Sequence, residues 1–152
     1  MTVLFRPVAP SDWIQIGRVA HEALPNAADD NREWLDARRS LDELSRRRRQ
    51  YVVQEDGAVV GYGAIEEDVD DGRWRLFVVM SPERLNGAPG NQTFARMLSE
   101  ARAVGAETLW MREEASDLAI ATFARRHELV ETQRYTAGPL PVVVYERELS
   151  QA

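Results

Sequence analysis

The 152-residue sequence contains no cysteine and no lysine, and all 19 of its basic residues are arginine. Without cysteine, disulfide frameworks and thiolate metal sites are excluded. Without lysine, the phosphate-binding loop that ends in Gly-Lys-Ser/Thr is excluded as well. No apolar run reaches the length of a membrane span, and residues 1–6 lack the charged start and apolar centre of a signal peptide. We therefore expect a cytoplasmic protein with no membrane partner.

Acidic residues outnumber basic ones by 25 to 19, which gives a formal net charge of −6. Such a balance argues against nucleic acid as a partner and favours cationic small molecules or amines. The only histidines, His21 and His127, fall in separate expected helices without a second ligand at metal spacing, so we expect no metal site. The length suits a single domain over residues 1–152 with one substantial core.

One stretch, residues 75–105, organises the chain. It opens with the apolar run Leu76–Met80, which has the length and composition of a buried strand and is stopped by Pro82. A loop with Gly87 and Gly90 follows, and apolar residues then recur at helical spacing up to Gly105. A buried strand, a glycine loop and a helix in this order predict a helix N-terminus that binds an anion, most simply a phosphate.

The spacing of the loop decides between families of phosphate-binding proteins. A Rossmann fingerprint needs its glycines directly after the strand, whereas here they come about eight residues late. Met80-Ser81-Pro82, followed by the loop 84–89 and by Gly90, instead resembles motif A of the GNAT family of acetyl-CoA-dependent N-acetyltransferases. Pro89 is suited to the first turn of the helix, where its missing N–H costs nothing.

The remaining pattern extends this resemblance over the whole chain. Asp56-Gly57 is a strong hairpin signal, and Val59–Ala64 is similar to the third strand of GNAT proteins. Arg46–Arg49 is expected to be a solvated helix end, with a patch for the CoA 3′-phosphate or for an acidic partner as the alternative. Strands are expected over residues 2–8, 50–55, 58–67, 76–80, 108–111, 129–135 and 142–149, and helices over 13–24, 31–49, 89–104 and from a cap at Ser116.

The expected order is β-α-α-β-β-β-α-β-α-β-β, which is the GNAT order. The fold class is therefore α/β (α+β), with a mixed central sheet of about seven strands and four helices. The resemblance also implies that strands 77–80 and 108–111 splay apart and that pantetheine pairs with the exposed backbone. The residues implied to bind acetyl-CoA or another acyl-CoA are Val78, Val79, Met80, Arg84, Leu85, Asn86, Gly87, Ala88, Pro89, Gly90, Asn91, Ser116 and Phe123.

The implied reaction is direct acyl transfer to the amine of a small molecule. A backbone N–H, for which we choose that of Val79, would polarise the thioester carbonyl. Carboxylates near strand ends are the candidate bases, and we choose Glu66 and Glu113. A Gly90→Glu substitution is expected to abolish cofactor binding by placing a carboxylate at the phosphate position.

One departure from the family pattern keeps a second function open. Where GNAT enzymes often carry Asn, Ala and Tyr in the helix after the fifth strand, this chain has Ser116, Ala119 and Phe123. Phe123 occupies the position of the usual general acid and has no proton to give. The alternative is a non-catalytic acyl-CoA-binding or protein-interaction module of the same fold. The last strands of such folds often pair, so a homodimer is possible by analogy.

Overall fold

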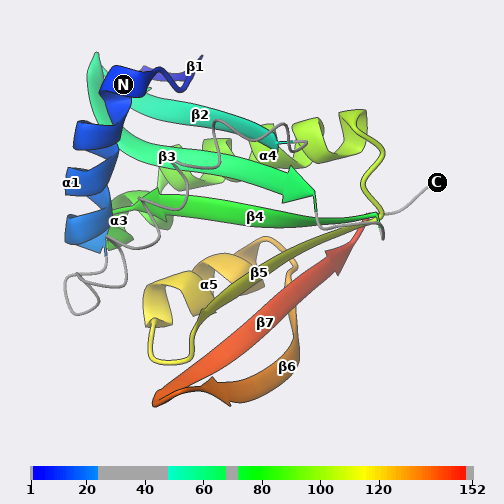
Figure 1. Ribbon diagram of the computed structural model, residues 1–152. Coiled ribbons are helices and arrows are strands. Elements are labelled where there is room, and N and C mark those ends of the chain that lie inside the picture. Colours follow the sequence, from blue (N-terminus) through cyan, green and yellow to red (C-terminus); the bar gives the residue numbers. More distant parts are fainter. Residues whose placement is uncertain (1, 24–47, 68–71, 150–152) are drawn as a thin grey trace.

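The computed structural model describes residues 2–23, 48–67 and 72–149. A seven-stranded mixed sheet forms its centre, in the spatial order β1-β2-β3-β4-β5-β7-β6 (Figure 1). A 3₁₀ turn (Pro10–Asp12) leads into the first helix. The elements are β1 (Val3–Pro7), α1 (Trp13–Ala23), β2 (Arg48–Glu55), β3 (Ala58–Glu67), β4 (Arg73–Met80), α3 (Pro82–Leu85), α4 (Ala88–Ala103), β5 (Thr108–Glu114), α5 (Leu118–Arg126), β6 (Val130–Ala137) and β7 (Leu140–Glu148).

All neighbouring strands are antiparallel except β4 and β5, which run parallel because a helical connection separates them. The expected fold class is confirmed. The expected helix 31–49 lies outside the described residues, apart from Arg48 and Arg49. Those two residues belong to β2, so the expectation that they end a helix was wrong. The one-turn helix α3 was not expected either. No helix among the described residues is long and apolar enough to cross a membrane.

Both faces of the sheet are covered, and alternation along β3 shows how. Tyr62 and Ala64 pack with Trp13 and Ile16 under α1, on one face. Ile65 belongs to the larger cluster on the opposite face, under α4 and α5. Because successive side chains of a strand point to opposite faces, a strand buried on both faces is apolar at almost every position. Residues 59–66 of β3 have this composition.

The β2–β3 hairpin confirms its sequence signal. Asp56 and Gly57 both have positive φ, 51° and 88°. Two consecutive residues with positive φ make the tight turn whose twist matches that of the strands, and the Asp-Gly pair tolerates it at little cost. This turn joins β2 to β3 directly, with Glu55 paired to Ala58.

Asp12 connects the first strand to α1 and is expected to matter for stability. Its carboxylate is buried, accepts two bonds from Arg6 at 2.9 and 2.8 Å, and accepts a third from the Ala9 N–H at 2.7 Å. The Arg6 hydrogen bond lowers the pKa of Asp12 below its ordinary 3.8. We expect Asp12→Asn to reduce the free energy of unfolding by about 1–2 kcal/mol at pH 7.

The same bond network predicts how the effect depends on pH. A depressed carboxyl pKa contributes stability above the unfolded-state pKa, and that contribution is lost as the pH falls through the folded-state pKa. Urea unfolding of both proteins should therefore show a gap at pH 7 that closes below pH 3.8. A gap that kept its full size well below that pH would contradict the ion-pair explanation.

Candidate functional site

The parallel strands β4 and β5 are paired over only part of their length and then separate. Only three residues of each are paired, ending at Arg75↔Trp110. Both strands continue, β4 to Met80 and β5 to Glu114, and Figure 1 shows them diverging. Their outer sides stay paired, β4 with β3 and β5 with β7. We call residues 76–80 of β4 and 111–114 of β5, all of which are described, the splayed segment; its facing backbone edges are unpaired.

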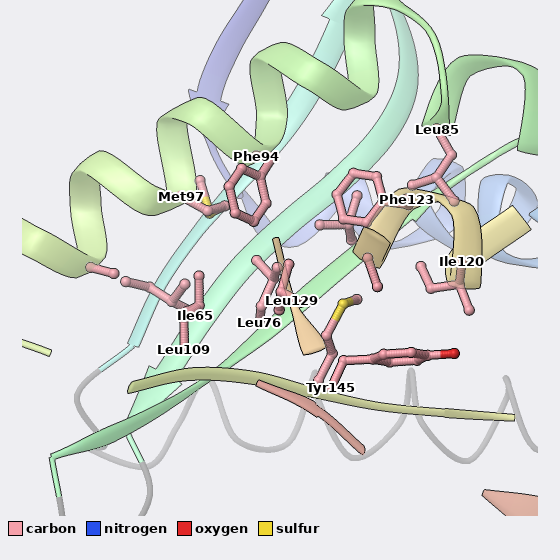
Figure 2. Close-up of a cluster of buried hydrophobic side chains, with 14 of the residues drawn as sticks. Ile65, Leu76, Leu85, Phe94, Met97, Leu109, Ile120, Phe123, Leu129 and Tyr145 are labelled. Atoms are coloured by element: carbon pink, nitrogen blue, oxygen red, sulfur yellow. The ribbon is translucent and has the colours of Figure 1, made fainter. Parts of the chain in front are cut away.

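Three side chains of the splayed segment pack under the helices on one face of the sheet. Val78 and Met80 from β4 and Met111 from β5 join Ile120 and Phe123 of α5 in one buried cluster, part of which is drawn in Figure 2. The divergence is thus stabilised by the core. Unsatisfied backbone groups at a sheet edge need a hydrogen-bonding partner. An extended ligand with amide groups would supply one.

The connection from β4 to α4 contains a close contact between helices. A Cβ at Gly90 would lie 1.8 Å from the Leu85 carbonyl oxygen, so α3 and α4 can approach this closely only because residue 90 is glycine. Gly87 is the N-cap of α4, and Pro89 falls at its second position. Because Asn91 N–H donates to the Gly87 carbonyl and Pro89 has no N–H, Ala88 and Gly90 are the amide donors of this helix start.

Two polar atoms in this connection fit a ligand. Ser81 Oγ and Asn86 Oδ1 are buried and have no hydrogen-bond partner within the described part of the chain. Asn86 is held in place because its Nδ2 donates to the Ala119 carbonyl of α5 at 3.0 Å. Buried polar atoms that lack a partner usually have one in the functional state. The residues present are therefore compatible with a polar cofactor arm at the carboxyl end of β4.

A second basic residue, which was not expected, lies beside this connection in addition to Arg84. Arg84 lies 3.7 Å from Glu55 at the end of β2. Arg126, from the last turn of α5, instead donates to the Asn86 carbonyl and, at 3.3 Å, to Asn91 Oδ1. Sequence spacing gave no signal for this contact, because 35 to 40 residues separate the partners.

Glu113 has the most unusual environment among the candidate bases. It lies on the splayed part of β5, half-buried, and burial raises its pKa to about 8. Arg75 opposes this rise, whereas Asp117 and Glu114 add to it. Arg75 belongs to β4 and Asp117 caps α5, so the Glu113 carboxyl senses charges from both sides of the opening strands. A carboxyl with a pKa near the working pH is suited to general base chemistry.

Glu66, the other expected base, lies elsewhere. It is buried on β3, opposite Arg48 of β2 and Arg75 of β4 in the sheet register. It lies on the α1 face at the level of the last β4–β5 pair, before the strands separate. The structure thus does not bring Glu66 and Glu113 together. Val79, the expected source of a polarising N–H, is half-buried within the splayed segment.

One further expectation needs correction. Ser116 is exposed, and Asp117 caps α5 instead by accepting from the Ile120 N–H at 3.1 Å. Phe123 is fully buried, with His127 and Phe94 at ring-centroid distances of 4.6 and 5.9 Å, so its side chain belongs to the core. The side chain of Leu85 is likewise in the core, and only its backbone borders the loop.

Comparison with known proteins identifies other structures with this fold. No family model and no curated protein sequence matches the chain. Solved structures match it over nearly its whole length. A Desulfovibrio desulfuricans protein described as a GNAT-family acetyltransferase has a TM-score of 0.75 and 21% identity, with 97% of this chain and 99% of that chain covered.

Two other solved structures show ligand and substrate classes within the same fold. The PaiA N-acetyltransferase from Thermoplasma acidophilum, in complex with coenzyme A, has a TM-score of 0.74 and 13% identity over 98% of this chain and 100% of that one. A spermidine N-acetyltransferase SpeG chimera from Vibrio cholerae and hSSAT has a TM-score of 0.76 and 12% identity, covering 97% and 96%. At these identities the likeness shows the fold: the chain has the fold of the GNAT acetyltransferases.

Proposed function

We propose that the chain is an acetyl-CoA-dependent N-acetyltransferase that transfers an acyl group to the amine of a small molecule in the cytoplasm. The observation that carries the proposal is Glu113, a half-buried carboxyl with a pKa of about 8, on the splayed part of β5. Two further features support it, namely the unpaired edge of β4 and the GNAT fold itself. Structures of this fold include one with coenzyme A bound.

In this proposal the chain holds the acyl donor mainly through its backbone. The edge of β4 at Val78, Val79 and Met80 would pair with the pantetheine amides, and a backbone N–H, that of Val79 in our assignment, would donate to the thioester carbonyl. The amides of Ala88 and Gly90 would face the pyrophosphate at the start of α4. Arg126 would add positive charge to that of Arg84.

Glu113 would take the proton of the attacking amine. Most simple amines are protonated near neutral pH, and only the neutral amine is a nucleophile. A carboxyl with a pKa of about 8 is a much stronger base than an exposed glutamate, while still partly ionised at neutral pH. The formal net charge of −6 would favour the approach of a cationic acceptor. A small polyamine, the substrate class of one structural neighbour, fits this charge.

Calorimetric titration with acetyl-CoA tests the cofactor assignment. We expect a dissociation constant on the order of 1 μM to 1 mM, the common range for enzyme substrates. Arg126→Ala should weaken binding about tenfold, since it removes one charge-assisted contact to phosphate. Arg125→Ala is the matched control, because Arg125 is an exposed neighbour on the same helical turn, and its affinity should be unchanged. Absence of binding to the native protein would contradict the proposal.

Phe123 favours the second candidate function, a non-catalytic acyl-CoA-binding module of the same fold. The side chain is fully buried and carries no proton donor. Release of CoA thiol in the presence of a broad amine panel distinguishes the two functions. Steady release with any amine excludes the non-catalytic module, whereas binding of acetyl-CoA without release in the whole panel favours it.

A further inference from the structure

We propose that the hydroxyl of Tyr145, on β7, protonates the departing CoA thiolate in place of a side chain on α5. This inference rests on the proposed N-acyltransferase function. Position 123 of α5 holds phenylalanine, packed against Phe94 and His127, so that helix offers no donor there. The strands that face the same helix offer the nearest alternative donors.

The sheet register places Tyr145 beside the candidate base. Tyr145 pairs with Met111 of β5, and Glu113 pairs with Val143 of β7. Glu113 and Tyr145 are thus diagonal neighbours on one face of an antiparallel pair, with Cβ atoms roughly 7 Å apart, within reach of long side chains. This is the face that α5 covers, since Met111, Val143 and Tyr145 share a cluster with Ile120.

The tyrosine side chain points toward the splayed end of the sheet. In Figure 2 its ring lies below Ile120, and its hydroxyl is at the end of the side chain farther from Leu109. Because Leu109 is near the start of β5, the hydroxyl is directed toward the carboxyl end of that strand, where Glu113 lies. Only 8% of Tyr145 is exposed, so packing restricts the ring to this orientation.

Two other described tyrosines already have hydrogen-bond acceptors on other surfaces. Tyr51 donates to Glu100 of α4 at 2.7 Å, and Tyr62 donates to Gln50 on the α1 face at 2.8 Å. Tyr135 lies on β6, the edge strand, beyond β7. Within the described part of the chain, Tyr145 is the tyrosine that combines burial under α5 with a place next to Glu113.

The charges around Tyr145 keep its hydroxyl protonated. Burial raises the pKa of Tyr145 above 10.0, and the nearby carboxylates of Glu131, Glu113 and Asp117 raise it further, whereas Arg134 lowers it. A phenol that holds its proton through neutral pH can act as an acid in each cycle. Its conjugate base would be strong enough to recover the proton from Glu113.

Glu113 and Tyr145 together account for every proton that is transferred in the proposed reaction. The amine nitrogen forms a bond to the acyl carbon, and its proton passes to Glu113. The bond between the acyl carbon and sulfur breaks, the electron pair leaves with sulfur, and the Tyr145 hydroxyl gives its proton to that sulfur. The protonated Glu113 then returns a proton to the Tyr145 phenolate, so the amide product and the free thiol are formed without any further reactant.

Tyr145→Phe, which keeps the ring and removes the hydroxyl, tests the assignment, with Tyr135→Phe as the matched control. We expect kcat of the first variant to fall about a hundredfold, the lower end for acid–base catalysis, with the acetyl-CoA dissociation constant and Tm unchanged. The control should keep the native kcat. Unchanged kcat in Tyr145→Phe, or a loss shared with weaker binding and a lower Tm, would overturn the inference.

The outcome is separable from failure of the proposed function. If the native protein turns over no amine, the proposed function fails, and this inference fails with it. If the native protein is active and Tyr145→Phe is equally active, only the inference about Tyr145 fails, and the acid is a different group or water.

Discussion

Gly90→Ala is expected to destabilise the protein by about 3 kcal/mol or more, although alanine is the better helix former. In an ordinary helical position the substitution would gain about 1 kcal/mol. Here the new Cβ would lie 1.8 Å from the Leu85 carbonyl oxygen and 2.4 Å from its carbon, which are backbone atoms of α3. Because backbone cannot rotate out of the way like a side chain, α3 or α4 must shift.

Urea unfolding measures this loss, and Gly87→Ala provides the matched control in the same loop. Gly87 has φ of −111°, and a Cβ there would be 3.0 Å from the Glu83 carbonyl oxygen, so a few tenths of an ångström of adjustment suffice. The control should lose much less stability than Gly90→Ala. Equal stability of Gly90→Ala and the native protein would show that α3 and α4 are not packed as described.

The close contact between residue 90 and the Leu85 backbone also changes the explanation expected for a loss of binding in Gly90→Glu. The sequence predicted that its carboxylate would occupy the phosphate position. The Cβ direction instead leads into the backbone of α3, so any loss of acetyl-CoA binding would follow from a displaced loop. Gly90→Ala should weaken binding for the same reason without adding charge. Loss of binding in Gly90→Glu alone, with stability retained in both variants, would favour the original electrostatic explanation.

The features that the sequence predicted well are those set by local chemistry. The apolar run Leu76–Met80 lies within β4, and Asp56-Gly57 forms the turn of the β2–β3 hairpin. Both could be predicted because strand burial and positive φ are encoded in adjacent residues. The order of the elements along the chain followed from the succession of these local patterns together with the resemblance to a family. Element boundaries moved by a few residues at most, as at the end of β5 and the start of β7.

The features that it missed depend on where a side chain turns after the chain has folded. Arg84 and Arg126 are both arginines near helix ends, and only packing decides that the first meets Glu55 while the second meets Asn91. Ser116 and Asp117 are both good caps, and one residue of register separates them. Glu113 could be suspected from its place after a buried strand, but its raised pKa reflects burial that no sequence pattern shows.

Glu113→Gln is expected to have opposite effects on activity and stability. If Glu113 is the general base, the amide cannot take a proton, and kcat should fall about 10²–10⁴-fold. Glu22→Gln, which alters an exposed residue in the last turn of α1, is the control and should be fully active. Activity equal to that of the native protein in Glu113→Gln would exclude this residue as the base.

The stability effect follows from the raised pKa. Between pH 4.5 and about 8 the folded protein keeps a proton on Glu113 that the unfolded chain has released. Stability from this group is therefore complete below pH 4.5, falls as the pH rises, and levels off above pH 8. Glutamine removes the cost of burying the charge, so Glu113→Gln should be more stable than the native protein by on the order of 2 kcal/mol at pH 9.

Unfolding at pH 4, 7 and 9 separates this explanation from a general gain in packing. We expect the two proteins to be nearly equal at pH 4, where both side chains are neutral, and to diverge toward pH 9. A gain of the same size at all three values would mean that the amide simply packs better. A variant that is inactive and yet more stable at alkaline pH would show that the fold maintains an unfavourable buried charge at the position where the proposed reaction needs a base.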